Sequence, residues 1–168
     1  MRGRLGGRTE MLMRRDEIEA RVLAALRLLV LRDGRLLELN VGERSIAAKL
    51  AGYMQPLFPA YDVDAEYNRH GIDPKRLPGG HECKEGQEPL IVPDIIVHQR
   101  GHNGSNLLVA EVKKFTNHEP RSCDESKVRG ILEQFAYRFG LLIEVEAGSS
   151  WNRVDPRLQW VSSSEGAA

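Results

Sequence analysis

Two carboxylates and a lysine stand at the ends of two apolar segments in the middle of the chain. Asp94 lies within segment 91–98, and Glu111 and Lys113 close segment 107–113. Ionised side chains are costly to bury unless they are paired or bind a metal. Neighbouring carboxylates favour a hard cation such as Mg²⁺ or Mn²⁺, and a nearby lysine can position a water and stabilise charge on a phosphate. These residue types indicate metal-assisted chemistry.

Both segments are predicted to be β-strands joined by a polar loop. Gly101 and Gly104, with the asparagines around them, supply residues that turn at low cost. Alternate side chains of a strand share a face, so Asp94 can lie beside Glu111 and Lys113 if the strands pair. The second strand is apolar as far as Glu111, which is typical of a strand buried on both faces.

The order Pro93-Asp94, then Glu111-Val112-Lys113, resembles the PD-(D/E)XK nuclease superfamily, which has a restriction-endonuclease-like fold. The resemblance covers roughly residues 40–146 by motif order. It implies that Asp94, Glu111 and the backbone carbonyl of Val112 bind Mg²⁺ or Mn²⁺, and that Lys113 orients the attacking water. The implied reaction is hydrolysis of DNA phosphodiester bonds.

The same resemblance adds an acidic residue from an earlier element. In the superfamily, a Glu on the helix before the first strand often completes the metal site, which implies a catalytic role for Glu43. The alternatives are that Glu43 closes a capping box with Asn40 or forms a surface ion pair. Glu66, on a predicted strand over 61–69, is either a further metal ligand, a support for Lys113, or a solvated residue of an edge strand.

Supporting residues are expected on the helix predicted over 124–140. Several branches of the superfamily place a Lys, or a Gln followed three residues later by a Tyr, on this helix near the site. Lys127, Gln134 and Tyr137 match that pattern. The competing interpretation is that they are ordinary polar residues of an amphipathic helix.

The remaining pattern predicts a single α/β domain over residues 14–162, with a central mixed β-sheet of four to five strands flanked by α-helices. Residues 1–13 are expected to be a disordered leader, residues 163–168 a disordered tail, and residues 70–88 a long loop. The other predicted elements are helices over 14–31 and 43–58, and strands over 141–146 and 157–162. The strand over 141–146 is expected to run parallel to 107–113.

Composition limits the partners and the location. The 24 Lys and Arg balance the 24 Asp and Glu, so a strong overall positive field is excluded, although a local patch for nucleic acid is not. The two cysteines, Cys83 and Cys123, are expected to form no disulfide framework and fit a reducing compartment. No apolar run approaches the ~20 residues of a membrane span, so a cytoplasmic protein is expected.

Three functions compete at this point. The first is a Mg²⁺-dependent endonuclease or exonuclease acting on DNA, in a possible homodimer or larger complex. The second is a catalytically silent module of the same fold that binds nucleic acid or a protein partner. In the third, Asp94 merely begins a strand, Glu111 pairs with Lys113 or Lys114, and the protein has another role.

Overall fold

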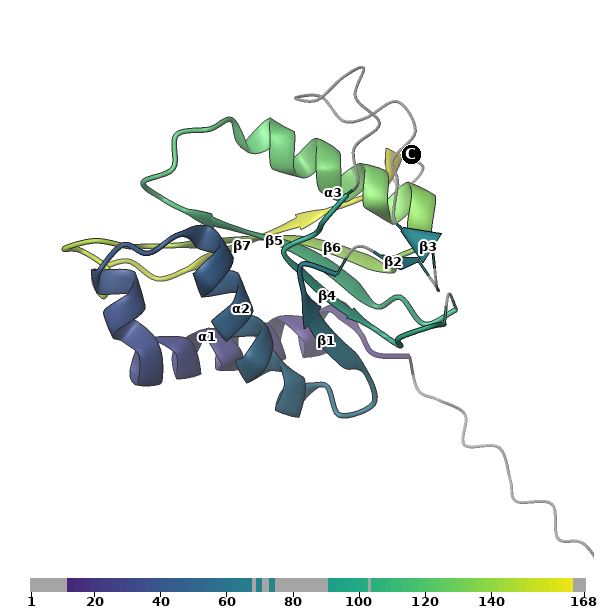
Figure 1. Cartoon of the computed structure of the whole chain (residues 1–168), viewed down its shortest axis with the longest axis horizontal. Helices are drawn as coiled ribbons and strands as arrows, with labels where there is room; N and C mark the ends of the chain where they lie inside the picture. Colours follow the sequence, from purple (N-terminus) through teal and green to yellow (C-terminus); the bar gives the residue numbers. More distant parts are fainter. Residues whose placement is uncertain (1–11, 68, 71–72, 75–90, 103, 165–168) are drawn as a thin grey trace, which may run out of the picture.

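A five-stranded mixed sheet forms the centre of the molecule, and helices cover both of its faces (Figure 1). The computed structural model describes residues 12–67, 69–70, 73–74, 91–102 and 104–164. The strand order is β1 (Asp62–Ala65), β4 (Ile95–His98), β5 (Leu108–Lys114), β6 (Phe139–Val145) and β7 (Arg157–Val161). Among the described strands of this sheet, β5 and β6 form a parallel pair and the other neighbours are antiparallel. The predicted α/β class, with a mixed sheet of four to five strands, is confirmed.

In the described part of the chain, three α-helices flank this sheet. α1 (Arg15–Glu38) and α2 (Glu43–Met54) pack on one face, and α3 (Arg121–Phe135) packs on the other (Figure 1). A 3₁₀ turn, η1 (Gln55–Leu57), follows α2, and β2 (Arg69–His70) pairs with β3 (Asp73–Pro74) in a separate two-stranded sheet. The hairpin of β4 and β5 and the parallel crossover through α3 to β6 both form as predicted.

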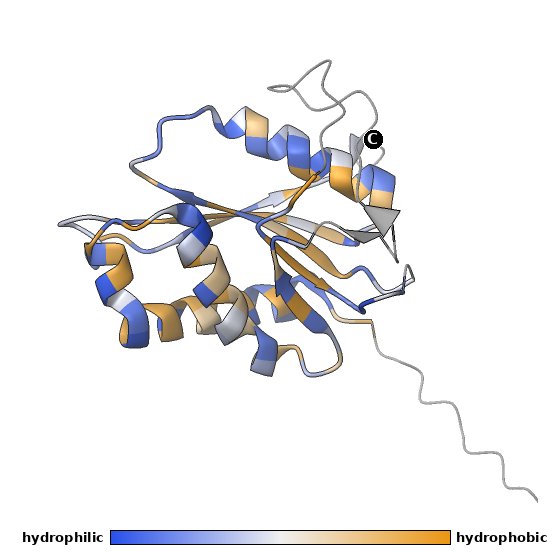
Figure 2. Ribbon diagram, viewed as in Figure 1, coloured by the Kyte–Doolittle hydropathy of each residue, from blue (hydrophilic) through white to orange (hydrophobic). Residues whose placement is uncertain are grey.

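Alternation along β5 divides the core into two layers. Leu108, Ala110 and Val112 pack in the layer with α1 and α2, and Val109 packs in the layer with α3. Glu111 follows Val109 by two residues, so it points to the α3 side. Figure 2 shows apolar residues along the central strands and hydrophilic residues at the end of β5. The strand is therefore buried on both faces and carries its charged groups at its carboxyl end.

The N-terminal helices differ from their predicted bounds. α1 continues to Glu38 instead of ending near residue 31, with a kink at Asp33, whose φ is −125°. The residue directly after the kink is Gly34. Glycine fits this position because a Cβ there would lie 2.6 Å from the Trp151 ring. The predicted capping box at Asn40 is wrong: Asn40 adopts a φ of 53°, and Gly42 is the N-cap of α2.

Three other boundaries also move. β1 ends at Ala65, because Glu66 turns the chain away with a φ of 54°. β4 is shorter than predicted and begins only at Ile95. α3 spans Arg121–Phe135, because Ala136 adopts a left-handed conformation and β6 begins three residues later. Tyr137 therefore lies outside the helix on which it was predicted.

Most of the predicted leader, loop and tail lies outside the described residues, which do not include 1–11, 75–90 and 165–168. Cys123 is disulfide-bonded, which contradicts the expectation that the two cysteines form no disulfide framework. Within the part of the chain that the structure describes, no helix is both long and apolar enough to cross a bilayer.

Candidate active site

Asp94 and Glu111 lie side by side where β4 begins. The register pairs Ile95 with Ala110, which sets the preceding Asp94 opposite Glu111. The Asp94 N–H donates to Glu111 Oε1 at 3.2 Å, and the Val112 N–H donates to Asp94 Oδ2 at 2.8 Å. The two carboxylates are thus brought together by backbone hydrogen bonds, in the arrangement expected if the strands pair.

Glu43 occupies the next position along the same edge of β5. Its Oε1 accepts the Lys114 N–H at 2.9 Å and the Asn117 side-chain amide at 2.8 Å. β4 pairs with β5 only as far as Ala110, so side chains replace a neighbouring strand at this edge. Asp94 accepts the N–H of Val112, and Glu43 accepts the next N–H on that side.

The Val112 carbonyl lies on this edge between the two carboxylates. The N–H and C=O of a strand residue point to the same side, and residues two apart share that side. The Val112 carbonyl therefore projects between Asp94 and Glu43. Three oxygen donor groups follow one another along the edge at the end of β5. Figure 1 shows this end of β5 beside the start of α2.

The pKa values of both Asp94 and Glu111 are raised in the folded protein. Burial raises the pKa of Asp94, and the Glu43 carboxylate adds to the rise. The hydrogen bond from Val112 and the Lys127 ammonium oppose it. Burial also raises the pKa of Glu111 to about 8; Lys127 opposes that rise and Asp94 adds to it. A nearby cation would lower both pKa values, because it favours the ionised carboxylates.

Lys127 is the lysine that contacts the acidic pair. Its Nζ lies 2.9 Å from each carboxylate oxygen of Glu111, whose side chain is only 7% exposed, and it donates to the Val92 carbonyl at 2.9 Å. Lys127 projects from α3 toward the sheet and was expected only as a supporting residue. The structure places it in direct contact with one of the principal site residues.

Lys113, unlike Lys127, forms its ion pairs with residues outside the acidic pair. Its Nζ lies 3.1 Å from Glu119 Oε2 and 3.1 Å from Asp124 Oδ2. Burial lowers the pKa of Lys113, but the hydrogen bonds to Asp124 and Glu119 raise it overall. In the described part of the chain, no ion pair joins Lys113 to Asp94 or Glu111. Lys113 is on the α3 side but is neutralised by the helix and the loop before it.

The other expected residues are not gathered here. The Glu66 carboxylate forms an ion pair with Arg44 on α2, and only its backbone N–H reaches the site, donating to the Asp94 carbonyl at 3.1 Å. Gln134 is exposed two helical turns beyond Lys127. Tyr137 is buried past the end of α3. Within the described residues, no side-chain hydrogen bond or ion pair joins Glu66, Gln134 or Tyr137 to the acidic pair.

Sequence reasoning missed the residues that hold the loop after β5. Arg121 forms an ion pair with Glu144 on β6 and donates to the carbonyls of Lys114, Asn117 and Glu119. This guanidinium fixes the loop that supplies Asn117 to Glu43 and Glu119 to Lys113. The only signal in the sequence is the concentration of polar residues directly after the motif, since functional groups gather in such loops.

The donor atoms suit a hard cation. Among the described residues, no group of three or more His, Cys, Asp or Glu side chains is placed to hold a metal ion. The edge of β5 instead offers Asp94, the Val112 carbonyl and the neighbouring carboxylates Glu111 and Glu43. Mg²⁺ needs only one or two protein carboxylates, because it retains several waters. The residues therefore fit Mg²⁺ or Mn²⁺ better than a softer metal.

A hollow lies next to this edge. It has a volume of about 440 Å³ and is lined by Asn40, Gly42, Glu43, Lys114, Thr116 and Asn117. Its lining is polar, and it opens beside the carboxylate that accepts the Lys114 N–H. A polar ligand can thus approach the end of β5 from the side of α2.

A second polar cluster lies toward the other end of β4. The buried His98 places Nε2 2.9 Å from Asp64 Oδ2, and Arg100 donates to the same carboxylate through Nε at 2.8 Å. Burial raises the pKa of Asp64, but the hydrogen bonds from Arg100 and His98 lower it overall. This cluster joins β1 to β4.

In comparisons with known proteins, no family model matches the sequence, and no curated protein or solved structure is significantly similar to the chain. A functional interpretation therefore depends on the site itself and on the resemblance of its short motif.

Proposed function

We propose that this protein is a Mg²⁺-dependent nuclease that hydrolyses DNA phosphodiester bonds at a PD-(D/E)XK-type site. The observation that supports the proposal is the pairing of Asp94 with Glu111 at the edge of β5, with Val112 between Asp94 and Glu43. These residues come from three elements that are distant in sequence. Their convergence on one open strand edge is more specific than the motif letters.

Asp94, Glu111 and the Val112 carbonyl would hold the cation, with Glu43 next to them directly or through water. A bound Mg²⁺ lowers the pKa of a coordinated water and stabilises negative charge on a scissile phosphate. The protein supplies the fixed geometry, because Asp94 and Glu43 are each held by a backbone N–H of β5. Preorganised groups of this kind need not rearrange during the reaction.

Two lysines serve the site in different ways. Lys127 contacts both oxygens of Glu111 and so keeps that carboxylate in place. Lys113 is a hydrogen-bond donor held by Asp124 and by Glu119, whose side chain is 74% exposed. An exposed ion pair contributes little free energy, so Lys113 can exchange Glu119 for a water or a phosphate oxygen. We expect Lys113 to orient the attacking water and Lys127 to position Glu111.

The test is a cleavage assay on supercoiled plasmid, linear duplex DNA, single-stranded DNA and RNA, with Mg²⁺, Mn²⁺ or EDTA. We expect metal-dependent cleavage by the wild type and at least about 100-fold lower activity in Asp94→Ala and Lys113→Ala. The matched control is Asp16→Ala, which removes an exposed carboxylate on α1. Cleavage that persists in EDTA, or in both site variants, would contradict the proposal.

The silent binding module stays the second candidate, because Lys113 is neutralised by two acids and Lys127 already compensates Glu111. Metal binding separates the two functions. Thermal stabilisation by Mn²⁺ that is lost in Asp94→Ala but kept in Asp16→Ala favours the enzyme. No stabilisation of the folded wild type favours the module. The cytoplasmic location stays a prediction in either case.

A further inference from the structure

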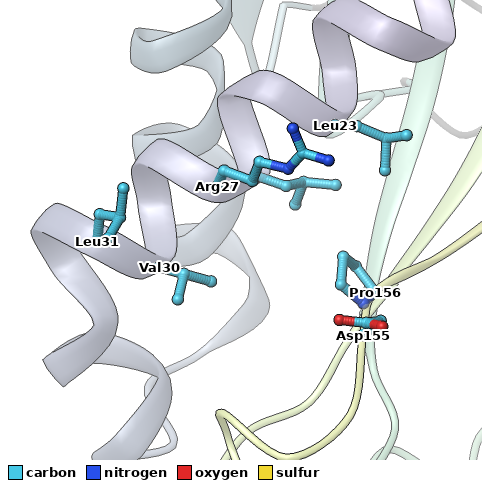
Figure 3. A pocket seen from close by; sticks show the side chains of 7 residues that line it. Leu23, Arg27, Val30, Leu31, Asp155 and Pro156 are labelled. Carbon is cyan, nitrogen blue, oxygen red and sulfur yellow. The ribbon is translucent and has the colours of Figure 1, made fainter.

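An apolar groove lies between α1 and the segment that precedes β7. It has a volume of about 550 Å³ and is lined by Leu23, Leu26, Arg27, Val30, Leu31, Asp155 and Pro156 (Figure 3). All but two of these side chains are apolar. α1 packs on the face of the sheet opposite α3, so the groove is separate from the side on which Glu111 and Lys127 meet.

Large apolar side chains are exposed at this groove. Leu31 is 80% exposed, and Val154, next to Asp155 in the chain, is 41% exposed. Single exposed leucines are common, but apolar residues gathered around a hollow mark an interaction surface. The groove thus offers both a projecting leucine and a space that an apolar side chain can fill.

Two opposite charges border the groove without meeting. Arg27 lies on the helix wall, and Asp155 lies on the facing wall (Figure 3). Both residues are exposed, and within the described residues neither forms a hydrogen bond or an ion pair. As far as the described residues show, the groove therefore has an unpaired cation on one wall and an unpaired anion on the other, with an apolar centre between them.

We propose that this groove is the interface between two copies of the chain. A two-fold interface is self-complementary: whatever one copy contacts on the other, the other contacts in return. Arg27 of one copy can meet Asp155 of the second, and the reverse, so both charges are satisfied twice. A partner of another kind would need its own matched pair of charges, whereas a second copy supplies them.

The spacing along α1 fits this arrangement. Leu23 and Leu31 each lie four residues from Arg27, so all three follow one ridge of the helix. The exposed Leu31 of one copy can therefore meet the apolar lining of the groove in the other. Leu31 then enters the groove of the second copy and loses its exposure to water.

The test is the oligomeric state of the full chain, measured by sedimentation velocity over a wide concentration range. We expect a wild-type dimer, and a monomer for Leu31→Glu, which places a charge in an apolar contact. Arg27→Asp should raise the dimer dissociation constant about tenfold, because the introduced carboxylate would then face Asp155 of the second copy. The double variant Arg27→Asp with Asp155→Arg should restore the wild-type constant to within about threefold.

Arg32→Asp is the matched control, since Arg32 is exposed on the same helix but does not line the groove. It should leave the dissociation constant unchanged, and far-UV circular dichroism should show that every variant is folded. A wild type that is monomeric at all concentrations would overturn the proposal. So would a dimer that is indifferent to Arg27→Asp, or a double variant that is no tighter than the single one.

Discussion

Glu111→Gln should change how the stability of the protein depends on pH. Burial raises the pKa of Glu111 from 4.5 to about 8, although Lys127 opposes the rise. At about 1.4 kcal/mol per pH unit, this difference corresponds to about 5 kcal/mol between the folded and unfolded states. Glutamine keeps the shape of the side chain but carries no titratable group.

The sign follows from proton binding. In the unfolded chain Glu111 ionises above about pH 4.5, whereas in the folded protein it keeps its proton until about pH 8. Between these values the folded state binds more protons, so the free energy of unfolding falls as pH rises. The contribution is fully present below the unfolded pKa and is lost as pH rises through the folded pKa.

We therefore expect the stability of Glu111→Gln, relative to the wild type, to increase by about 1 kcal/mol per pH unit from about pH 5 to 8. The total is at most about 5 kcal/mol, because water and local relaxation reduce the effect of burial. Urea unfolding at several pH values in EDTA measures the difference. Titrating groups distant from Glu111 cancel in this comparison, since both proteins contain them.

Glu38→Gln is the matched control, because the Glu38 side chain is 44% exposed and lies at the end of α1. The dependence on pH should be steeper for Glu111→Gln than for this control. If Glu111→Gln behaves in the same way, the carboxyl group of Glu111 is not held protonated by burial and the reasoning is refuted. Added Mg²⁺ should flatten the wild-type dependence only, because a metal binds the ionised carboxylate.

Two further substitutions test the scaffold around the site. Gly140→Ala should cost about 1–3 kcal/mol in urea unfolding, because its Cβ would lie 2.6 Å from Val128 Cγ1; Gly52→Ala, which has open space, should cost nothing, and equal effects would contradict the packing of α3 on β6. Asp64→Asn should cost about 1–3 kcal/mol at neutral pH, because it weakens the hydrogen bonds to His98 and Arg100. Burial raises the pKa of Asp64 but those hydrogen bonds lower it overall, so this stabilisation is lost as pH falls through the folded pKa. A cost that is unchanged in acid would contradict the assignment.

Local sequence patterns predicted much of the fold. The apolar alternation of β5 identified a strand buried on both faces, and the same period placed Glu111 and Lys113 on one side. The crossover through α3 to a parallel β6 followed from the lengths of the segments. Periodicity predicts such features because it depends only on neighbours along the chain.

Helix ends and caps were less predictable, because local patterns compete. The residues after α3 continue a helical pattern, but Ala136 adopts a left-handed conformation so that β6 can begin beside β5. Asn40 matched a capping box, but it turns with a positive φ and leaves Gly42 to begin α2. In both places the position of the next element overrides the local preference.

Residue order and periodicity were enough to predict which residue types could form the site and which strands carry them: Asp94 before β4, and Glu111 and Lys113 on β5. The partners of these residues could not be predicted, because contacts between distant elements depend on packing rather than on spacing. It brought Lys127 to Glu111, tied Lys113 to Asp124, and set Glu43 on the open edge of β5. A strand edge left unpaired by a short β4 must satisfy its N–H groups with side chains, and that need gathers the carboxylates in one place.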